Sequence, residues 1–281
     1  MTDPFTTSYE PFSREPEYID LNRRFVESLG LSGDQPILEL ACGTATVTEQ
    51  ILKVVSGARI VGLDLSRESL TLGQKHLAAV PGGASVVLVE ASADSMPIAS
   101  ASVGAIVMGN SVQLVDDKDR LFEEARRVLT PRGLFACNTS FYAGTYVPGT
   151  ERFYTRWVVE AANYVKRKSD EGRAQGLAGI ARKRGAADRA FSRPWLSARA
   201  YCEFLERHGF TVRSVFERTV MLDQRCFETI GSYAGLAGVL LSGYPVALAC
   251  EALERAAGPA LSACGLTEVP RYWLEIVAVR G

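Results

Sequence analysis

Two acidic side chains and the turn of small residues between them could bind a nucleoside. Glu39 lies in the apolar stretch Pro36–Leu40, and Asp64 ends a second apolar stretch, Ile60–Asp64. Between them, the small side chains of residues 41–45 would let backbone N–H groups come close to a ligand. A carboxylate at the end of the second strand can accept hydrogen bonds from both hydroxyls of a ribose. The pattern is typical of a nucleoside-binding βαβ unit.

The motifs E-x-A-C-G-T-A, residues 39–45, and G-L-D-L-S, residues 62–66, resemble the first two motifs of the class I S-adenosylmethionine (SAM) dependent methyltransferases. The common family form is D/E-x-G-x-G-x-G, and this chain has alanine at two of the three glycine positions. A dinucleotide-binding oxidoreductase would have G-x-G-x-x-G and no acid inside the strand. The order of motifs looks most like that of small-molecule and quinone or sterol C-methyltransferases.

This resemblance implies which residues contact SAM. Glu39 would accept from the methionine ammonium, residues 41–44 would provide backbone contacts, Asp64 would hold the ribose, and Leu65 and Ser69 would flank the adenine. The implied cofactor-binding residues are Tyr9, Glu39, Ala41, Cys42, Gly43, Thr44, Asp64, Leu65, Ser69, Ser92, Ala93 and Asn110. In the alternative interpretation, Glu39 is a strand-edge acid and Asp64 caps a helix.

The third motif departs from the family pattern. V-E-A-S-A-D-S-M-P, residues 89–97, resembles the family's G-D-A-x-x-L-P, whose acid binds the adenine amino group. This alignment places Ser92 at the position of the acid, where a serine still accepts a hydrogen bond as a neutral group. Asp94 is the alternative contact. Asn110, after the strand Val103–Met108, either holds the methionine end or orients a substrate, or is an ordinary turn residue.

Neither histidine is placed for proton transfer. His76 lies in a polar helical stretch, where we expect it to be solvated, and His208 lies at a helix end, where it complements the terminal carbonyls. A general base, if one is needed, would be a carboxylate or a tyrosine, and the candidates are Glu228, Tyr233 and Tyr142. No histidine lies near a cysteine or carboxylate cluster of ligand spacing, so the sequence predicts no metal site.

Strand and helix signals alternate along the chain, which predicts an α/β fold with parallel strands. The expected strands are Pro36–Leu40, Ile60–Asp64, Ser85–Glu90, Val103–Met108, Leu134–Thr139, Phe210–Phe216 and Tyr272–Val279. The expected helices are Glu17–Leu29, Ala45–Val55, one capped by Ser66, Lys118–Leu129 and Ser197–His208. The resemblance implies a Rossmann-like, seven-stranded, mostly parallel sheet with helices on both faces and a last antiparallel strand.

Two blocks interrupt this alternation, and we interpret them as helical lid insertions on one domain, residues 1–281. The core covers about 17–140, 195–218 and 270–281, and the insertions cover about 141–194 and 219–269. Aromatic residues open the first insertion, where they suit an apolar or cationic guest or form the core of the lid. Its basic segment, residues 166–193, is a solvated face, a site for an anionic substrate group, or an arm that docks RNA.

Composition narrows the class of protein. Net charge is −1, which argues against a globally basic nucleic-acid binder. The chain has no apolar run long enough to span a membrane, and its polar, acidic start does not resemble a signal peptide. Its 6 cysteines are scattered, as in a reduced, cytoplasmic protein. The sequence predicts a small-molecule substrate and no nucleic-acid partner, and leaves a homo-oligomer open.

Together these features predict SAM-dependent methyl transfer to a small organic molecule, with S-adenosylhomocysteine as the product. The acceptor would be apolar or aromatic and could carry an anionic group. The missing histidine favours C-methylation slightly over O-methylation. The alternatives are an RNA or protein methyltransferase that uses the basic segment, a SAM-binding protein without transfer activity, and a SAM-site enzyme of another reaction such as a cyclisation.

Overall fold

A seven-stranded sheet of order β3-β2-β1-β4-β5-β7-β6 forms the centre of the molecule, in a computed structural model that describes residues 9–182 and 194–281. β7 is antiparallel to both neighbours, and the other strands are parallel to one another. The fold class predicted from the sequence is therefore confirmed. The strands are β1 (Ile37–Leu40), β2 (Ile60–Asp64), β3 (Val86–Glu90), β4 (Val103–Gly109), β5 (Leu129–Thr139), β6 (Phe210–Asp223) and β7 (Glu268–Arg280).

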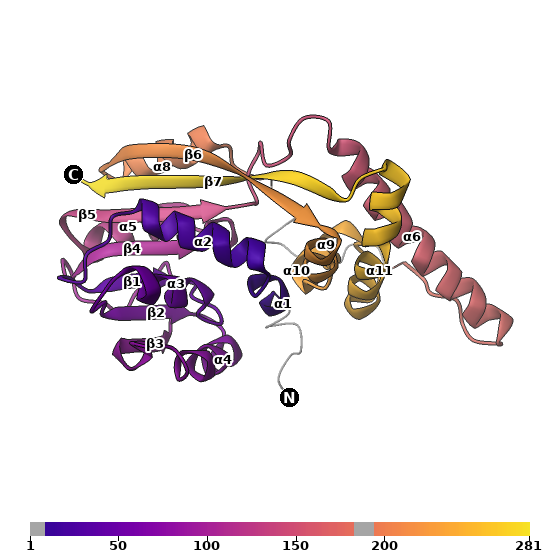
Figure 1. The fold of residues 1–281 in the computed structure, drawn as a ribbon, viewed down its shortest axis with the longest axis horizontal. Coiled ribbons are helices and arrows are strands. Elements are labelled where there is room, and N and C mark those ends of the chain that lie inside the picture. Colours follow the sequence, from indigo (N-terminus) through magenta and orange to yellow (C-terminus); the bar gives the residue numbers. More distant parts are fainter. Residues whose placement is uncertain (1–8, 183–193) are drawn as a thin grey trace.

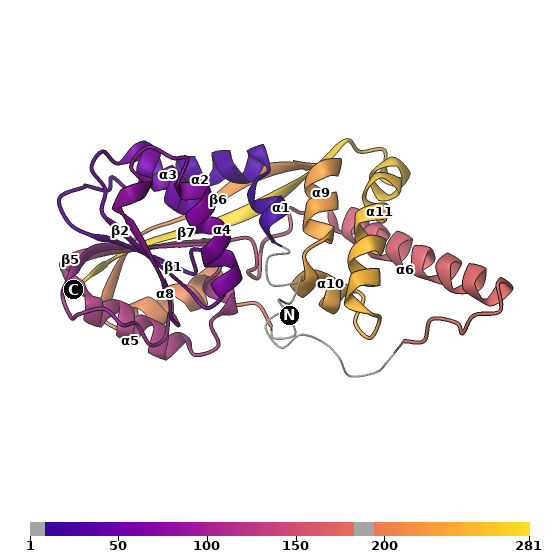
Figure 2. The same ribbon diagram turned by 90° about the horizontal axis from the view of Figure 1, so that it is seen from below.

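Helices cover both faces of this sheet (Figure 2). On one face, α2 (Pro16–Ser28) and α3 (Thr46–Val54) bury Phe25 and Ile51 against the apolar strand residues. On the other face, α5 (Lys118–Val128) and α8 (Ala198–Arg207) bury side chains such as Phe122. α4 (Arg67–Leu77) follows β2, and the short helices η1 (Gly83–Ser85) and η2 (Val112–Leu114) precede β3 and follow β4. Alternate residues of the central strands supply both cores.

A separate helical layer lies beyond the carboxyl ends of the parallel strands (Figure 1). It contains α6 (Glu151–Ala174), α9 (Gln224–Gly231), α10 (Ala234–Leu240) and α11 (Val246–Cys264), and the short α1 (Glu10–Ser13) packs against it. Trp157 of α6 is buried and donates its Nε1–H to the Leu253 carbonyl of α11 at 2.8 Å. The two predicted insertions thus share one core. No described helix is long and apolar enough to cross a membrane.

The last two strands are longer than predicted. β6 continues from the expected end at Phe216 to Asp223, and β7 begins at Glu268 instead of Tyr272. Their register runs from Phe210↔Arg280 to Asp223↔Glu268, so they form one long antiparallel ribbon that leaves the sheet. The far half is ordered because its apolar side chains, such as Leu222 and Val269, join the core of the helical layer. β6 therefore crosses residue 218, where the sequence placed the edge of the core.

Residues 130–133, which separate the expected helix Lys118–Leu129 from the expected strand Leu134–Thr139, lie inside β5. Leu129 pairs with Val103 before the turn, and Leu134 pairs with Ala105 after it, with a register shift between the two pairs. Arg132 has a φ of 63°, so the backbone bends there as in a bulge and the strand then continues. β5 therefore begins at Leu129 instead of Leu134, because the chain pairs with the same neighbouring strand before and after the bend.

Candidate functional site

A pocket opens at the carboxyl ends of β1, β2 and β4, where the strand order reverses. This switch point is the usual ligand site of open α/β sheets. The pocket contains about 890 Å³ of space including its mouth. Of the sequence-predicted residues, it is lined by Tyr9, Glu39, Ala41, Cys42, Gly43, Thr44, Asp64, Ser69, Asn110 and Tyr233.

The turn after β1 forms the floor of the pocket with left-handed backbone at three positions. Ala41, Gly43 and Ala45 have φ values of 50°, 53° and 68°. Two alanines thus adopt a conformation that usually costs a non-glycine residue about 1 kcal/mol or more. Gly73 of α4 lets that helix approach closely, because a Cβ there would lie 3.2 Å from the Cβ of Ala45. At Gly43 a Cβ would meet no atom within 4 Å, so the turn presents open backbone to a ligand.

Glu39 is a buried carboxyl on the pocket wall. Its side chain is on β1, and Thr48 at the start of α3 donates a hydrogen bond to it. Burial raises the pKa of Glu39 to about 8, and the nearby Asp64 adds to the rise. The carboxyl is therefore largely protonated at neutral pH in the free protein. A cation placed beside it would favour the ionised form and bind tightly to it.

Asp64 faces Glu39 from the end of β2. Its Oδ2 accepts the Gly43 N–H at 2.8 Å, and its Oδ1 accepts the Ser66 N–H at 2.8 Å. Burial also raises the pKa of Asp64. The N-cap of α4 is Ser66, whose hydroxyl accepts the Ser69 N–H at 3.1 Å. Asp64 thus ties the β1 turn to the β2 turn, and its remaining lone pairs are available to a ligand.

Aromatic rings form the opposite wall. Tyr9 contacts Tyr18 and Tyr233 edge-on, with ring centroids 5.8 Å and 5.1 Å apart. Asn110, at a φ of 47°, donates from Nδ2 to the Tyr9 hydroxyl at 2.6 Å and accepts the Ser140 N–H at 2.7 Å. Burial holds the pKa of Tyr9 well above its usual value. Rings of this kind suit a positively charged sulfur or nitrogen centre.

Five sequence-predicted residues lie outside the lining of this pocket. Leu65 is 72% exposed, and Ser92, next to Ala93, donates its hydroxyl hydrogen bond to Asp94. Tyr142 is buried and donates to Glu217 at 2.6 Å, and Glu228 accepts from Gln224 at 2.7 Å. The residues in this group are Leu65, Ser92, Ala93, Tyr142 and Glu228. Their proposed contacts with adenine or acceptor stay predictions.

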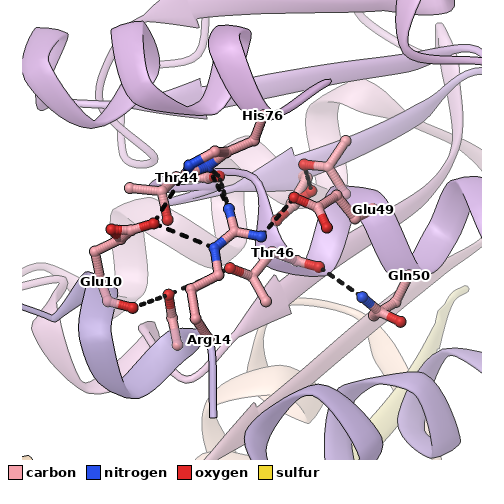
Figure 3. Close-up of polar contacts among 10 residues, drawn as sticks. Glu10, Arg14, Thr44, Thr46, Glu49, Gln50 and His76 are labelled. Carbon is pink, nitrogen blue, oxygen red and sulfur yellow. Dashed lines mark hydrogen bonds and ion pairs between the residues drawn. The ribbon is translucent and has the colours of Figure 1, made fainter. Parts of the chain in front are cut away.

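The N-terminal segment closes one side of the pocket, which the sequence did not reveal beyond Tyr9. Glu10, Ser13 and Tyr18 join the lining. Arg14 holds this segment in place: it pairs with Glu49 of α3 at 2.6 Å and donates to the Thr44 carbonyl at 2.9 Å (Figure 3). The only local signal was the run of aromatic and charged residues before α2.

His76 belongs to this cluster, and the expectation that it is solvated is wrong. Its Nδ1 accepts a hydrogen bond from Arg14, and its Nε2 lies 3.5 Å from Glu10 (Figure 3). About 32% of the side chain is exposed. The sequence gave no sign of this because Arg14 and Glu10 reach His76 only through the docking of α1 onto α4. His208 meets Asp119 at 2.8 Å at its helix end.

No group of three or more His, Cys, Asp or Glu side chains in the described ranges could hold a metal ion. The basic segment is only partly described. Lys166 and Lys168 are exposed on α6 and pair with Asp170 at 2.8 Å and Glu251 at 3.5 Å. The basic residues at 183, 184, 189 and 193 lie outside the described residues.

Both the sequence and the fold that form this site have matches among known proteins. Residues 38–137, which carry β1 to β5, match the family model described as a methyltransferase domain. No curated protein sequence gives a significant match. The fold is similar to that of a candidate sarcosine dimethylglycine methyltransferase from Galdieria sulphuraria, at 13% identity and a TM-score of 0.58, over 94% of this chain and 86% of that one.

Two further structures share the fold. The (4+2)-cyclase SpnF has 16% identity and a TM-score of 0.57, over 94% of this chain and 81% of that one. A geranyl diphosphate C-methyltransferase from Streptomyces coelicolor has 16% identity and a TM-score of 0.53, over 93% of this chain and 79% of that one. Residues 38–137 thus match a methyltransferase domain model, and the whole sheet has the Rossmann-like fold of these structures.

Proposed function

We propose that the protein is a SAM-dependent methyltransferase that acts on a small organic molecule. The observation that carries the proposal is the pair of pocket-lining carboxyls on neighbouring strands, the buried Glu39 and the partly buried Asp64, on either side of an open backbone turn. SAM, when bound, supplies a methyl group already activated by its sulfonium. The geranyl diphosphate C-methyltransferase with the same fold was studied with S-adenosylhomocysteine, the demethylated product.

The residues of this chain fit such a donor group by group. Asp64 is placed to accept from a ribose, and Glu39 from an ammonium, while Gly43 offers backbone without a side chain in the way. Tyr9, Tyr18 and Tyr233 face the sulfonium end. The enzyme then has to align the acceptor behind the methyl group and exclude water. We propose that α1 and the layer of α6, α9, α10 and α11 act as the lid that does so.

The acceptor we favour is a carbon nucleophile or another group that needs no strong base. No histidine is among the described residues that line the pocket. Burial raises the pKa of Tyr18 to about 12 and holds that of Tyr9 well above its usual value, so neither ring becomes a tyrosinate near neutral pH. A C-methyltransferase among the structures of this fold supports this proposal, which fits the quinone- or sterol-like branch.

Cyclisation is the second reaction to be tested, because one protein of the same fold is a cyclase. Such an enzyme would use the same pocket without moving a methyl group. A nucleic-acid or protein acceptor would dock on the basic segment 166–193, of which Lys166 and Lys168 are already paired with acids. Product analysis separates these alternatives directly.

Binding and turnover are to be measured separately. We expect titration calorimetry to give one site per chain for SAM and for S-adenosylhomocysteine, with dissociation constants of about 1–100 μM. Incubation of isotopically labelled SAM with fractionated small metabolites should then yield a product heavier by one methylene group. Binding without any such product would contradict methyl transfer, and absence of binding would contradict the proposal as a whole.

Arg14 should control how long the donor stays bound. Replacing it with methionine removes the contacts to Glu49 and Thr44 that hold α1 over the pocket. We expect the dissociation rate of S-adenosylhomocysteine in stopped-flow displacement to rise about tenfold, with a smaller change in association rate. Arg23→Met is the matched control, because Arg23 pairs with Asp20 and Glu27 on the exposed side of α2. Equal rates in both variants would contradict the role of Arg14.

A further inference from the structure

A second cleft lies between α5, the α8–β6 turn and the end of β7, and its lining is strongly basic. It contains about 900 Å³ of space including its mouth. The lining residues with basic side chains are Arg126, Arg127, Arg207, His208 and Arg280, with Glu123 as the acid among them. We propose that this cleft binds a small phosphate-bearing anion, independently of the donor pocket.

Two of the arginines already have carboxylate partners. Arg127 binds Glu124 through two hydrogen bonds of 2.7 and 2.8 Å and also donates to backbone carbonyls. Arg207 and His208 share Asp119, at 2.9 and 2.8 Å. These side chains are held in place by their own ion pairs. They shape the wall of the cleft, but their acidic partners largely neutralise the positive charge that they bring to it.

Arg126 and Arg280 carry the positive charge of the cleft that no carboxylate neutralises. Within the described ranges neither guanidinium forms an ion pair with a carboxylate, and Glu123 is engaged by Arg120 at 3.3 Å. Arg280 donates to the Leu129 carbonyl, but its Nε is buried and has no hydrogen-bond partner. A buried donor without a partner costs about 1–3 kcal/mol. An anion in the cleft would offset the repulsion between the two cations.

The backbone is shaped to admit the Arg126 guanidinium. Gly209 has a φ of 77°, and a Cβ at this position would lie 2.8 Å from the Arg126 Nε. The glycine therefore lets the side chain lie directly against the α8–β6 turn. Arg280 comes from the other side, at the end of β7, where it pairs in register with Phe210. The two unpaired cations thus reach one cleft from different elements.

This cleft is remote from the donor pocket. β5 begins at Leu129 and β6 at Phe210, so the cleft lies at the amino ends of these parallel strands. The donor pocket lies at the carboxyl ends of β1, β2 and β4. Figure 1 shows this separation, with the C-terminus at one end of the sheet and α1 at the other. A ligand in the cleft would not compete with the donor.

The chemistry favours phosphate over a monocarboxylate. Two unpaired guanidiniums require about two negative charges, and a guanidinium fork matches the oxygens of a phosphate group in bidentate fashion. A single carboxylate would neutralise only one of them. The occupant we infer is therefore a phosphate or diphosphate group, either free or as an ester on a small metabolite.

Inorganic pyrophosphate is the probe, titrated into the intact protein by calorimetry at constant ionic strength. We expect saturable binding with a dissociation constant below about 1 mM. Arg126→Gln and Arg280→Gln should each weaken it about tenfold or more. Arg199→Gln, which changes the same charge at an exposed position of α8 outside the cleft, should leave it unchanged. Because Arg280 contacts the backbone, the unfolding midpoint of each variant is measured alongside, and Arg126→Gln alone is decisive if Arg280→Gln unfolds.

The outcomes separate the sources of binding. Saturating S-adenosylhomocysteine should not change the affinity for pyrophosphate; competition would place the anion in the donor pocket and overturn the proposal. Binding that is equally weakened by Arg199→Gln would be a diffuse charge effect, and equal affinity for acetate would identify a carboxylate site; either result contradicts it. The test does not depend on methyl transfer, so failure here leaves the proposed activity untouched.

Discussion

Replacing Asp64 with alanine should lower the affinity for SAM by about 100-fold or more, because two hydrogen bonds from a ribose to a carboxylate are lost. The same change removes the acceptor of the Gly43 and Ser66 N–H groups, at 2.8 Å each. The turn that carries the donor would loosen as a consequence. Calorimetry with SAM and with S-adenosylhomocysteine should show the same loss, since both share the ribose.

Glu90→Ala is the matched control for this experiment. Glu90 is the acid at the end of the neighbouring strand, in register with Asp64, but it lies outside the pocket and pairs with Arg67 at 2.7 Å. We expect the Glu90→Ala variant to bind SAM with the affinity of the unmodified protein. Both variants should keep a cooperative unfolding transition. Undiminished affinity in Asp64→Ala would remove the basis for the nucleoside site.

The sheet and the floor of the pocket could be predicted because their signals are local. β1 and β2 are short apolar runs that end in acids, and the small residues between them leave the chain few other conformations. The cap at Ser66 was also visible, since it depends on a few adjacent residues. The local pattern did not show which strand β5 pairs with on each side of its bend. β5 bends at Arg132 and then pairs with β4 again.

The parts that escaped prediction depend on contacts between distant residues. The far half of β6 is exposed on alternate residues and is ordered by its pairing with β7, about 50 residues later in the chain. The closure of the pocket by Arg14 joins three helices through Glu49 and His76. No spacing rule connects these positions, so His76 looked like a surface residue. Tyr18 was absent from the predicted site for the same reason.

Glu39 should make the free protein less stable as the pH rises. Its folded-state pKa is about 8, whereas the ordinary value is 4.5. Between these values the folded state keeps a proton that the unfolded state has released, so the free energy of unfolding falls with increasing pH across this window. The raised pKa of Asp64 acts in the same direction. The total loss for Glu39 would be up to about 5 kcal/mol, and it is nearly complete once the pH exceeds 8.

Glu39→Gln tests this directly, because glutamine keeps the shape and can still accept from Thr48. We expect urea unfolding of the variant to depend much less on pH between 5 and 8, and the variant to be more stable than the unmodified protein at pH 8. Glu203→Gln, at an exposed position of α8, should keep the full pH dependence. A flat profile in the unmodified protein would contradict the burial argument.

The same carboxyl should couple donor binding to proton release. A cation bound beside Glu39 favours its ionised form, so affinity for SAM should rise from pH 6 to pH 8 as less work is needed to remove the proton. Calorimetry in buffers of different ionisation enthalpy should detect release of up to one proton per SAM near pH 7. Glu39→Gln should bind more weakly and release correspondingly fewer protons. An affinity independent of pH in the unmodified protein would mean that the ammonium lies elsewhere, leaving Asp64 as the single acidic contact of the donor.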